Sequence, residues 1–435
     1  MNVRTFRMRT LLILVVSFAV AAAVWLSVAS ATNHKKMAVP PDAVLTWNTI
    51  TVNAVRASTP TKFQTDGMVY MSYVQAAVYD AVMKLDGRYA PYHDFAYAVV
   101  PGTSVQAAVA AAARKTLDNY LPDQSGTVDA AYNAYIATLT GNVADGVALG
   151  EAAAADIIAY RAGDGLNAAT PAYGAIGPLI VGQWQLLPGQ KVQTPWFATL
   201  RPFLLDSPAQ FRAEPPPAIT SRQYANDLNE TQAYGAVNST VRSPEQKAIA
   251  YFWVGNNINQ YNRTMQTAVK EHSMDLVDAA HLFAIGNIVT TDAGLACYDS
   301  KFFYQAWRPT AAIQNADKDN NPDTTADPTW QPLLGLPGHP EYPSQHGCFT
   351  SAFTDALSEG IGSDHLDIDM PGGANGLSTL TVTQHFNTVS DVQKQVIDAR
   401  VWLGFHFRNS VKVGVDLGND VAKWELKNFF GKVKS

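Results

Sequence analysis

The chain has 435 residues, of which 47% are hydrophobic and 16% charged, the composition of a folded globular protein and not of a disordered one. Its formal net charge of -6 and the absence of a basic run argue against a nucleic-acid partner, so any bound anion must be attracted by a local pocket. After the N-terminal region, no further segment is apolar for about 18 residues, which excludes a protein with several membrane spans.

The N-terminus has the pattern of an export signal. Three arginines within the first nine residues precede an apolar run over 11–29, and the small residues at 29–31 suit a cleavage site. The run is also long enough to span a bilayer. We therefore expect residues 1–31 to be a signal peptide or an uncleaved N-terminal anchor, and the remainder to be exported, either secreted or periplasmic. A membrane contact is expected only if this segment is retained.

Helical periodicity dominates the rest of the chain. Apolar residues recur at helical spacing in two stretches, and alternating strand-like patterns are scarce. The stretches are Met71, Val74, Val78, Val82 and Leu85, and Leu417, Val421 and Trp424. The Ala-rich segments near 105–115 and 149–160 favour helices that pack closely. The predicted fold is therefore mainly α, with two helical bundles.

Two Pro- and Gly-rich stretches interrupt this pattern. Residues 166–220 end in three consecutive prolines and predict a long connection over the surface, and residues 315–343 predict a second excursion. We place an N-terminal bundle with its long connection at 42–240 and a C-terminal bundle, which carries the functional residues, at 241–435.

The first candidate motif is Lys301 with Arg308-Pro309. A spacing of seven residues places two side chains on one helix face, about 10 Å apart along the axis, from which both can reach one anion. Pro309 would disturb or end the helix and so fix the direction of Arg308. The alternative is a solvated cationic face, but the intervening aromatic residues are too apolar for that.

The second motif, Pro343-Ser344-Gln345-His346, predicts the start of a helix that runs to about Leu357. Ser344 is a good N-cap, and a helix N-terminus offers free N–H groups to an oxyanion. His346 would face the same oxygens as a proton donor or acceptor. The alternative is an ordinary cap followed by a packed histidine.

The third motif joins Arg400 and His406. Six residues apart, they lie on different faces of a continuous helix, so they can meet only if the helix breaks near Gly404. If it does, the chain returns His406 toward Arg400. Otherwise the pair is a buried histidine and an exposed arginine.

Taken together, the motifs Lys-x6-Arg-Pro, Pro-Ser-x-His and Arg-x5-His resemble the signature of the vanadium-dependent haloperoxidases and the type 2 phosphatidic-acid-phosphatase-like (PAP2) acid phosphatases. Further segments resemble the secreted haloperoxidase-like branch: 291–294, 307–309, 339–342 and 403–408. The likeness is good over about 240–430. The resemblance implies two α-helical bundles, which agrees with the periodicity.

The resemblance also implies a role for each site residue. Lys301, Arg308 and Arg400 would neutralise the oxygens of vanadate or phosphate, and Ser344 and the Gln345 amide would add hydrogen bonds. His406 would ligate vanadium or attack phosphorus, with His346 opposite as acid–base. Vanadate would be the cofactor of a haloperoxidase, and a phosphatase would need none. Two flanking residues, Tyr298 and His339, fall where such haloperoxidases line the halide approach, and a histidine at 339 resembles bromide-preferring members.

Three departures from the family pattern concern activity. Gln345 replaces a glycine and brings bulk beside the anion. Ala399 stands where a serine often precedes the arginine. Ser410 replaces an aspartate four residues after the axial histidine, so we expect His406 to be less basic or to be held by a backbone carbonyl.

The chain has two cysteines, Cys297 and Cys348, and both flank the proposed site. In an exported protein they could form one disulfide. The alternative is two small buried thiols.

These observations leave three functional hypotheses. The first is an exported haloperoxidase that oxidises halide with hydrogen peroxide and delivers a hypohalous-acid equivalent to an organic acceptor. The second is an acid phosphatase that cleaves phosphomonoesters through a phosphohistidine at His406, with His346 protonating the leaving group. The third is an inactive helical protein that keeps the anion pocket.

Overall fold

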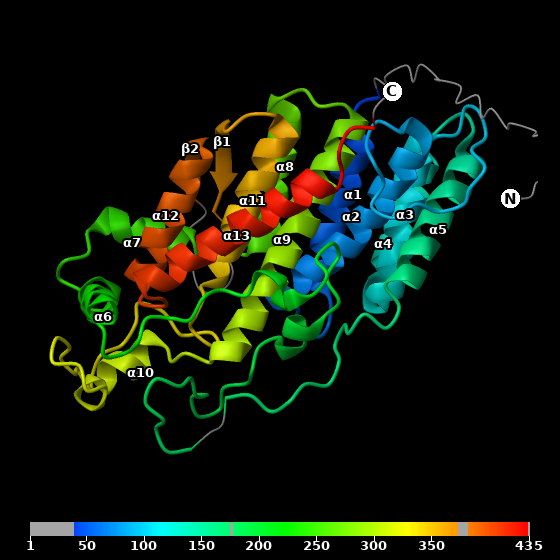
Figure 1. Cartoon of the computed structure of the whole chain (residues 1–435). Helices are drawn as coiled ribbons and strands as arrows, with labels where there is room; N and C mark the ends of the chain where they lie inside the picture. The colour runs from blue at the N-terminus through cyan, green and yellow to red at the C-terminus, as the bar shows by residue number, and fades with distance from the viewer. Residues whose placement is uncertain (1–38, 175–176, 373–381, 434–435) are drawn as a thin grey trace, which may run out of the picture. The chain divides into compact units, whose positions relative to one another are not determined.

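Helices make up most of the computed structural model, which describes residues 39–174, 177–372 and 382–433 (Figure 1). The mainly α prediction is confirmed. Within the described ranges there is one sheet, which was not predicted, an antiparallel pair of short strands. The expected signal or anchor at 1–31 lies outside the described residues. The elements in order are α1 (Asp42–Ala57), α2 (Gln64–Asp86), α3 (Val105–Tyr120), η1 (Pro122–Gln124), α4 (Ser125–Ile136), α5 (Val143–Tyr160), η2 (Pro195–Thr199), η3 (Pro208–Phe211), α6 (Arg222–Gly235), α7 (Pro244–Phe252), α8 (Asn257–Glu271), α9 (Leu276–Tyr304), α10 (Pro309–Gln314), η4 (Ala316–Lys318), α11 (Gln345–Ile361), β1 (His365–Pro371), β2 (Thr383–Thr388), α12 (Val389–Trp402) and α13 (Arg408–Asn428).

The N-terminal helices pack as the apolar pattern predicts. Met71, Val74 and Val78 of α2 are buried. The Ala-rich helix α3 lies so close to α5 that a Cβ on Gly146 or Gly150 would collide with the backbone of the α3 region. Small residues thus allow two helices to approach almost backbone to backbone, as expected for these segments.

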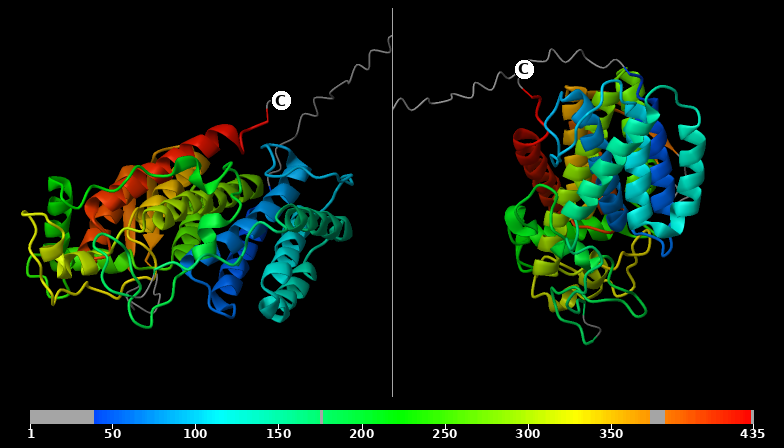
Figure 2. Two further views of the ribbon diagram at one scale, coloured as in Figure 1. Left: turned by 60° about the horizontal axis from the view of Figure 1, so that its bottom comes forward. Right: turned by 90° about the vertical axis from the view of Figure 1, so that its right-hand side faces the viewer.

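Helix α9 is the central element of the described chain. It has 29 residues, nearly all buried, and contacts α2, α11 and α13. Figures 1 and 2 show it running between the blue N-terminal helices and the orange and red C-terminal ones. A helix that is apolar on all sides belongs in a core. Because α9 packs against both groups of helices, the division into bundles at 42–240 and 241–435 stays a prediction.

The start of α11 is fixed against α13 by two glycines. A Cβ on Gly347 would lie 2.6 Å from the carbonyl oxygen of Val411, and one on Gly414 would lie 2.6 Å from that of Ser344. Side chains are excluded at such distances, so the two helices can cross this closely only with glycine at both positions. The crossing sets the position of Ser344.

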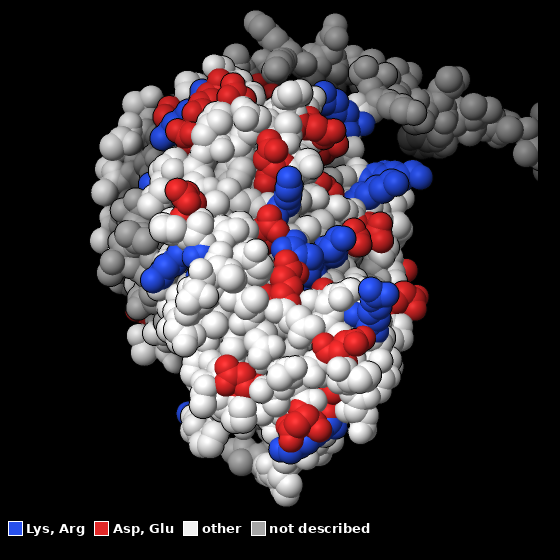
Figure 3. All heavy atoms as spheres, turned by 90° about the vertical axis from the view of Figure 1, so that its left-hand side faces the viewer, with Lys and Arg blue, Asp and Glu red and all other residues white. Residues whose placement is uncertain are grey.

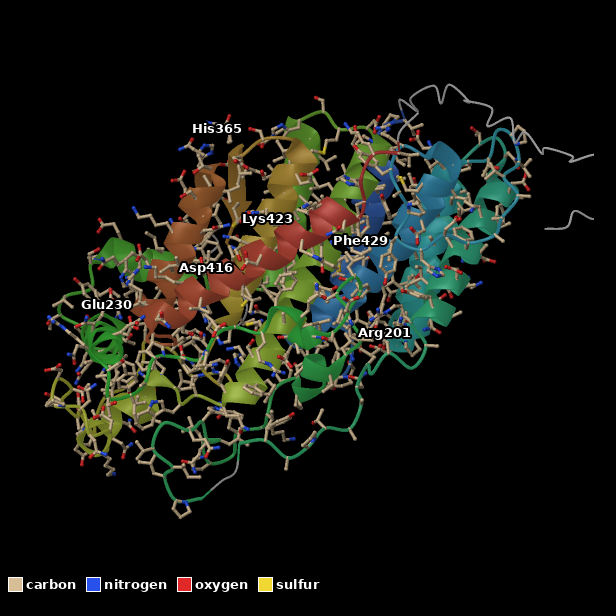
Figure 4. The ribbon with its side chains drawn as sticks, viewed as in Figure 1. Arg201, Glu230, His365, Asp416, Lys423 and Phe429 are labelled. Carbon is tan, nitrogen blue, oxygen red and sulfur yellow. The ribbon has the colours of Figure 1, made fainter. Side chains whose placement is uncertain are left out.

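An ion-pair cluster ties the start of α13 to two other helices. Arg408 pairs with Glu230 of α6 at 2.8 Å and with Asp398 of α12 at 2.7 Å. Figure 4 labels Glu230 on α6, at the end of the molecule where α12 and α13 meet. The cluster therefore helps to fix the turn between α12 and α13, which contains His406.

Charge is mixed on the face drawn in Figure 3, where Lys and Arg lie among Asp and Glu and no large patch of one sign is visible. Among the described residues, no helix combines the length and apolar character needed to cross a membrane.

Candidate active site

The candidate site lies where four helix ends meet: the end of α9, the starts of α10 and α11, and the end of α12. The expectation that Lys301 and Arg308 share one helix is wrong. Helix α9 ends at Tyr304, Gln305 adopts a left-handed conformation with φ of 47°, and Arg308 is extended before α10. Proline disfavours a helical residue before it, so Pro309 starts a new helix and leaves Arg308 outside both.

The predicted break near Gly404 is confirmed. Helix α12 ends at Trp402, and Gly404 has φ of 73°, which favours glycine. A Cβ there would lie 2.7 Å from the carbonyl oxygen of Gly235, so close packing also requires glycine. The turn brings the Nε2 of His406 to 3.2 Å from the Nη1 of Arg308.

Three buried cations surround this point. Lys301, Arg308 and Arg400 are 0%, 3% and 3% exposed. Backbone carbonyls accept many of their hydrogen bonds: Lys301 Nζ donates to Pro340 and Glu341, and Arg400 Nη1 donates to Trp253. Burial lowers the pKa of Lys301 to about 8 and also lowers the pKa of both arginines.

Positive charge in the site exceeds negative charge. Arg308 is close enough to lower the pKa of both Lys301 and Arg400 by repulsion. Within the described chain, the carboxylate that acts on both Lys301 and Arg308 is Glu341. One carboxylate cannot balance three buried cations, and an unpaired buried charge is costly. The arrangement therefore favours binding of an anion.

Unpartnered polar atoms converge on the same place. Helix α11 begins at Gln345 with Ser344 as its N-cap, as predicted, but the Ser344 hydroxyl makes no capping bond. Ser344 Oγ, His346 Nε2 and Arg400 Nε are buried and have no hydrogen-bond partner in the protein. Buried polar atoms are normally paired, so these three atoms, with the free amides of a 17-residue helix, fit a small oxyanion such as vanadate or phosphate. Among the described residues, no group of three His, Cys, Asp or Glu is placed to hold a metal ion.

The orientation of His406 depends on a residue that the sequence reasoning did not single out. His406 Nδ1 lies 2.9 Å from Oε1 of Glu341, and the same oxygen accepts from the Phe407 amide at 3.1 Å. A carboxylate oxygen with two donors can only accept, so Nδ1 carries the proton and Nε2 presents its lone pair. Burial, with the nearby arginines and Lys301, holds the pKa of His406 well below its ordinary value, so the ring is neutral.

Although Ser410 replaces the aspartate of the family pattern, a carboxylate still orients His406, and it belongs to Glu341. Of the two alternatives expected for His406, being less basic or being held by a backbone carbonyl, the second is wrong, because a carboxylate holds the imidazole from the loop before α11. Ser410 donates to the backbone oxygen of Glu341 at 3.4 Å, so it supports the loop that carries the carboxylate. Burial raises the pKa of Glu341 to about 7. The available sequence signal was the segment His339-Pro340-Glu341-Tyr342, in which Glu341 is the one carboxylate and lies three residues before Ser344.

The other predicted site residues lie in the same buried region. Tyr298 donates to the side-chain oxygen of Gln345 at 2.8 Å, and this hydrogen bond fixes the position of the Gln345 side-chain amide. The rings of Tyr298 and His339 are 5.5 Å apart, and Arg308 Nη2 donates to His339 Nδ1 at 2.9 Å. Both predicted halide residues therefore border the cations. Burial holds the pKa of His339 and of His346 well below the ordinary value.

The predicted disulfide is absent, since Cys297 and Cys348 are both free and buried. They come from the packed helices α9 and α11, where their thiols lie close enough for a hydrogen bond. The alternative of two small thiols filling a helix interface is the one observed. Burial raises the pKa of Cys348 well above its ordinary value, so this thiol stays protonated and unreactive.

The family comparison covers the part of the chain that forms the site. Residues 281–433 match the family model described as the VCPO second helical-bundle domain. The vanadium chloroperoxidase of Curvularia inaequalis is 24% identical over 297 residues, which are 53% of this chain. The match spans about half of that relative, 48% of its length.

Solved structures share the fold over most of the chain. A bacterial vanadium-dependent iodoperoxidase superposes with a TM-score of 0.75 at 20% identity, covering 91% of this chain and 98% of its own. A bacterial vanadium-dependent chloroperoxidase in its holo form gives a TM-score of 0.64 at 20% identity, covering 83% of this chain and 91% of its own. These structures show the shared fold, and the family model together with the Curvularia inaequalis relative confirms the resemblance to the vanadium-dependent haloperoxidases that the sequence motifs indicated.

Proposed function

We propose that the protein is a vanadate-dependent haloperoxidase that oxidises halide with hydrogen peroxide to a hypohalous-acid equivalent. The observation that carries the proposal is the buried excess of positive charge next to unpartnered atoms of Ser344, His346 and Arg400. The family of relatives described above supports vanadate as the oxyanion. When bound, vanadate would supply a Lewis-acidic centre that activates hydrogen peroxide toward halide.

The chain's own residues would prepare the site in three ways. Lys301, Arg308 and Arg400 neutralise oxyanion charge, and Ser344 with the Gln345 amide donates hydrogen bonds. Glu341 fixes the tautomer of His406, so Nε2 carries the lone pair, which accepts from Arg308 Nη1 in this structure and would hold vanadate. His346, neutral and with Nε2 unpartnered, would hold or release a proton beside the bound oxyanion.

The acid phosphatase remains a second candidate, because the same geometry at His406 suits attack on phosphorus. A neutral ring with Nδ1–H bound to a carboxylate has its nucleophilic lone pair at Nε2. Phosphoryl transfer to Nε2 would break the ester bond, and His346 would protonate the departing alcohol. This candidate needs room for an ester group beside Gln345.

The deciding assay compares purified protein with and without orthovanadate. A haloperoxidase should form triiodide from iodide and peroxide, or brominate a phenolic dye, only after vanadate is added. A phosphatase should hydrolyse p-nitrophenyl phosphate and be inhibited by vanadate. His406→Ala should abolish whichever activity is present, and full activity of that variant would refute the assignment.

A further inference from the structure

The Gln345 side chain is the feature of the site that the family pattern does not explain, because a glycine usually stands there. Gln345 is the first residue of α11 and lies between Ser344 and His346, which both have a buried polar atom without a partner in the protein. It is only 6% exposed. A glycine would offer its backbone amide to a bound oxyanion and nothing more. This chain adds a long side chain between the two residues that would receive the anion.

A chain of hydrogen bonds holds this side chain in one position. The Tyr298 hydroxyl donates its single proton to Gln345 Oε1 at 2.8 Å, so the Thr65 hydroxyl must donate to the Tyr298 oxygen at 3.1 Å. Tyr298 and Thr65 are both buried. The Tyr298 ring is itself packed edge-on against Phe197, with ring centroids 5.1 Å apart. Three helices, α2, α9 and α11, therefore fix the Gln345 side-chain amide.

The same contacts place the Gln345 side chain beside the cations. Tyr298 precedes Lys301 by three residues on α9, a spacing that puts both side chains on one face of the helix. The Tyr298 ring also lies 5.5 Å from the ring of His339, which accepts from Arg308. Gln345 is thus attached to α11 at one end and to Tyr298 at the other. It cannot swing aside to admit a larger ligand without breaking a buried hydrogen bond, which is unfavourable.

We propose that Gln345 is a specificity-determining residue, which restricts the site to oxyanions without an organic substituent. A phosphate ester differs from orthophosphate by its alcohol group, and that group has to lie next to His346, the residue that would protonate it. Glycine would leave room there, whereas the fixed glutamine side chain fills it. Tyr298 is a positioning residue, because it acts through Gln345. The inference rests on the proposed function for the oxyanion that the site admits, and it disfavours the phosphatase hypothesis.

The test compares two phosphorus oxyanions that differ in bulk. Calorimetric titration gives the dissociation constants of orthophosphate and of phenylphosphonate, which carries a ring and has no ester bond to hydrolyse. In Gln345→Gly the ratio of the phenylphosphonate constant to the orthophosphate constant should fall at least about tenfold, because the steric conflict with the ring is removed. Gln345→Ala, which restricts the backbone more than glycine does, should show the same fall. Gln106→Gly removes an equivalent side chain from the second position of α3 and should leave the ratio unchanged.

Tyr298→Phe tests the positioning role separately. It removes the hydroxyl that holds Gln345 and should lower the same ratio about threefold to tenfold, the range for one hydrogen bond. In the Gln345→Gly background it should have no further effect, because no side chain is left to position. A purely structural role of Tyr298 would change the ratio equally in both backgrounds, and that result would overturn its assignment as a positioning residue.

Triiodide formation by wild type with orthovanadate reports on the proposed function alone, and circular dichroism shows whether each variant is folded. If wild type forms no triiodide, the proposed function fails, while a lower ratio in Gln345→Gly would still support the size restriction. If wild type binds phenylphosphonate as tightly as orthophosphate, or if folded Gln345→Gly and Gln345→Ala keep the wild-type ratio, the size restriction is refuted. A wild type that binds neither oxyanion and forms no triiodide would refute both.

Discussion

Among the buried ionisable residues of helix α9, Asp292 and Lys301 differ in how well their charges are matched by partners. Asp292 accepts three backbone N–H groups, from Phe203, Leu204 and Leu205, at 2.7–3.2 Å. The carboxyl of Glu425 lies beside Asp292, and burial and Asp292 raise the pKa of Glu425 well above the ordinary value, so this neighbour is neutral. Lys301 has only two carbonyls and stands among other cations. A buried charge with matched partners supports structure, whereas one left in excess indicates a missing ligand.

The largest effect should come from removing the matched carboxylate. Asp292→Ala leaves three buried N–H groups without their acceptor, which should cost about 3–5 kcal/mol of unfolding free energy. Urea denaturation followed by tryptophan fluorescence measures the change. Asp292→Asn, which keeps a carbonyl acceptor, should lose less. A stable Asp292→Ala would show that residues 203–205 need no such anchor.

Removing one of the unmatched cations should change the stability of the ligand-free protein in the opposite direction. Arg400→Met removes a buried charge with an unpartnered Nε, so the ligand-free protein should be as stable as wild type or gain about 1–4 kcal/mol. Vanadate affinity should fall about tenfold to a hundredfold, since a charge-assisted hydrogen bond contributes about 1.5–3 kcal/mol. Denaturation gives the change in stability, and calorimetric titration gives the vanadate affinity. Destabilisation of the ligand-free protein with unchanged affinity would contradict the comparison.

Glu341 combines the two situations seen at Asp292 and at Lys301. It is hydrogen-bonded to His406, and its charge also offsets part of the charge of Lys301 and Arg308. Glu341→Ala should lower activity about tenfold to a hundredfold, the usual cost of losing a partner that orients a ligand. Glu341→Gln keeps an acceptor for Nδ1–H and should lose less activity, while binding vanadate more tightly because a negative charge is gone. Nitrogen NMR of the His406 ring reports its tautomer. An unchanged ring signal in Glu341→Ala would show that Glu341 does not position it.

The sequence predicted the helical fold and the break at Gly404 because both depend on local chemistry, namely apolar spacing and glycine's conformational freedom. It did not predict that Lys301 and Arg308 occupy different elements, because Pro309 disfavours a helical Arg308 but does not mark the earlier stop at Tyr304, where Gln305 turns left-handed. The role of Glu341 was missed for another reason. Its partner is 65 residues away, and only the three-dimensional return of the chain brings the two together.

The smallest expected effect, a change of affinity with pH, tests the charge balance of the cationic region directly. Sulfate is a suitable probe because its charge is constant between pH 6 and 9. As pH falls through about 7, Glu341 becomes protonated and the site gains positive charge; as pH rises through about 8, Lys301 loses its charge. The histidines have pKa values well below this range and stay neutral.

Both changes act in the same direction, so sulfate should bind more tightly at pH 6 than at pH 9, by at least about tenfold, which is 1.4 kcal/mol. Glu341→Gln should remove the step near pH 7 and keep the one near pH 8, because only the second belongs to Lys301. Calorimetric titration at several pH values resolves the two. A sulfate affinity that is flat with pH in wild type would mean that these two groups do not set the charge felt by the anion, and the contrast with Asp292 would lose its electrostatic basis.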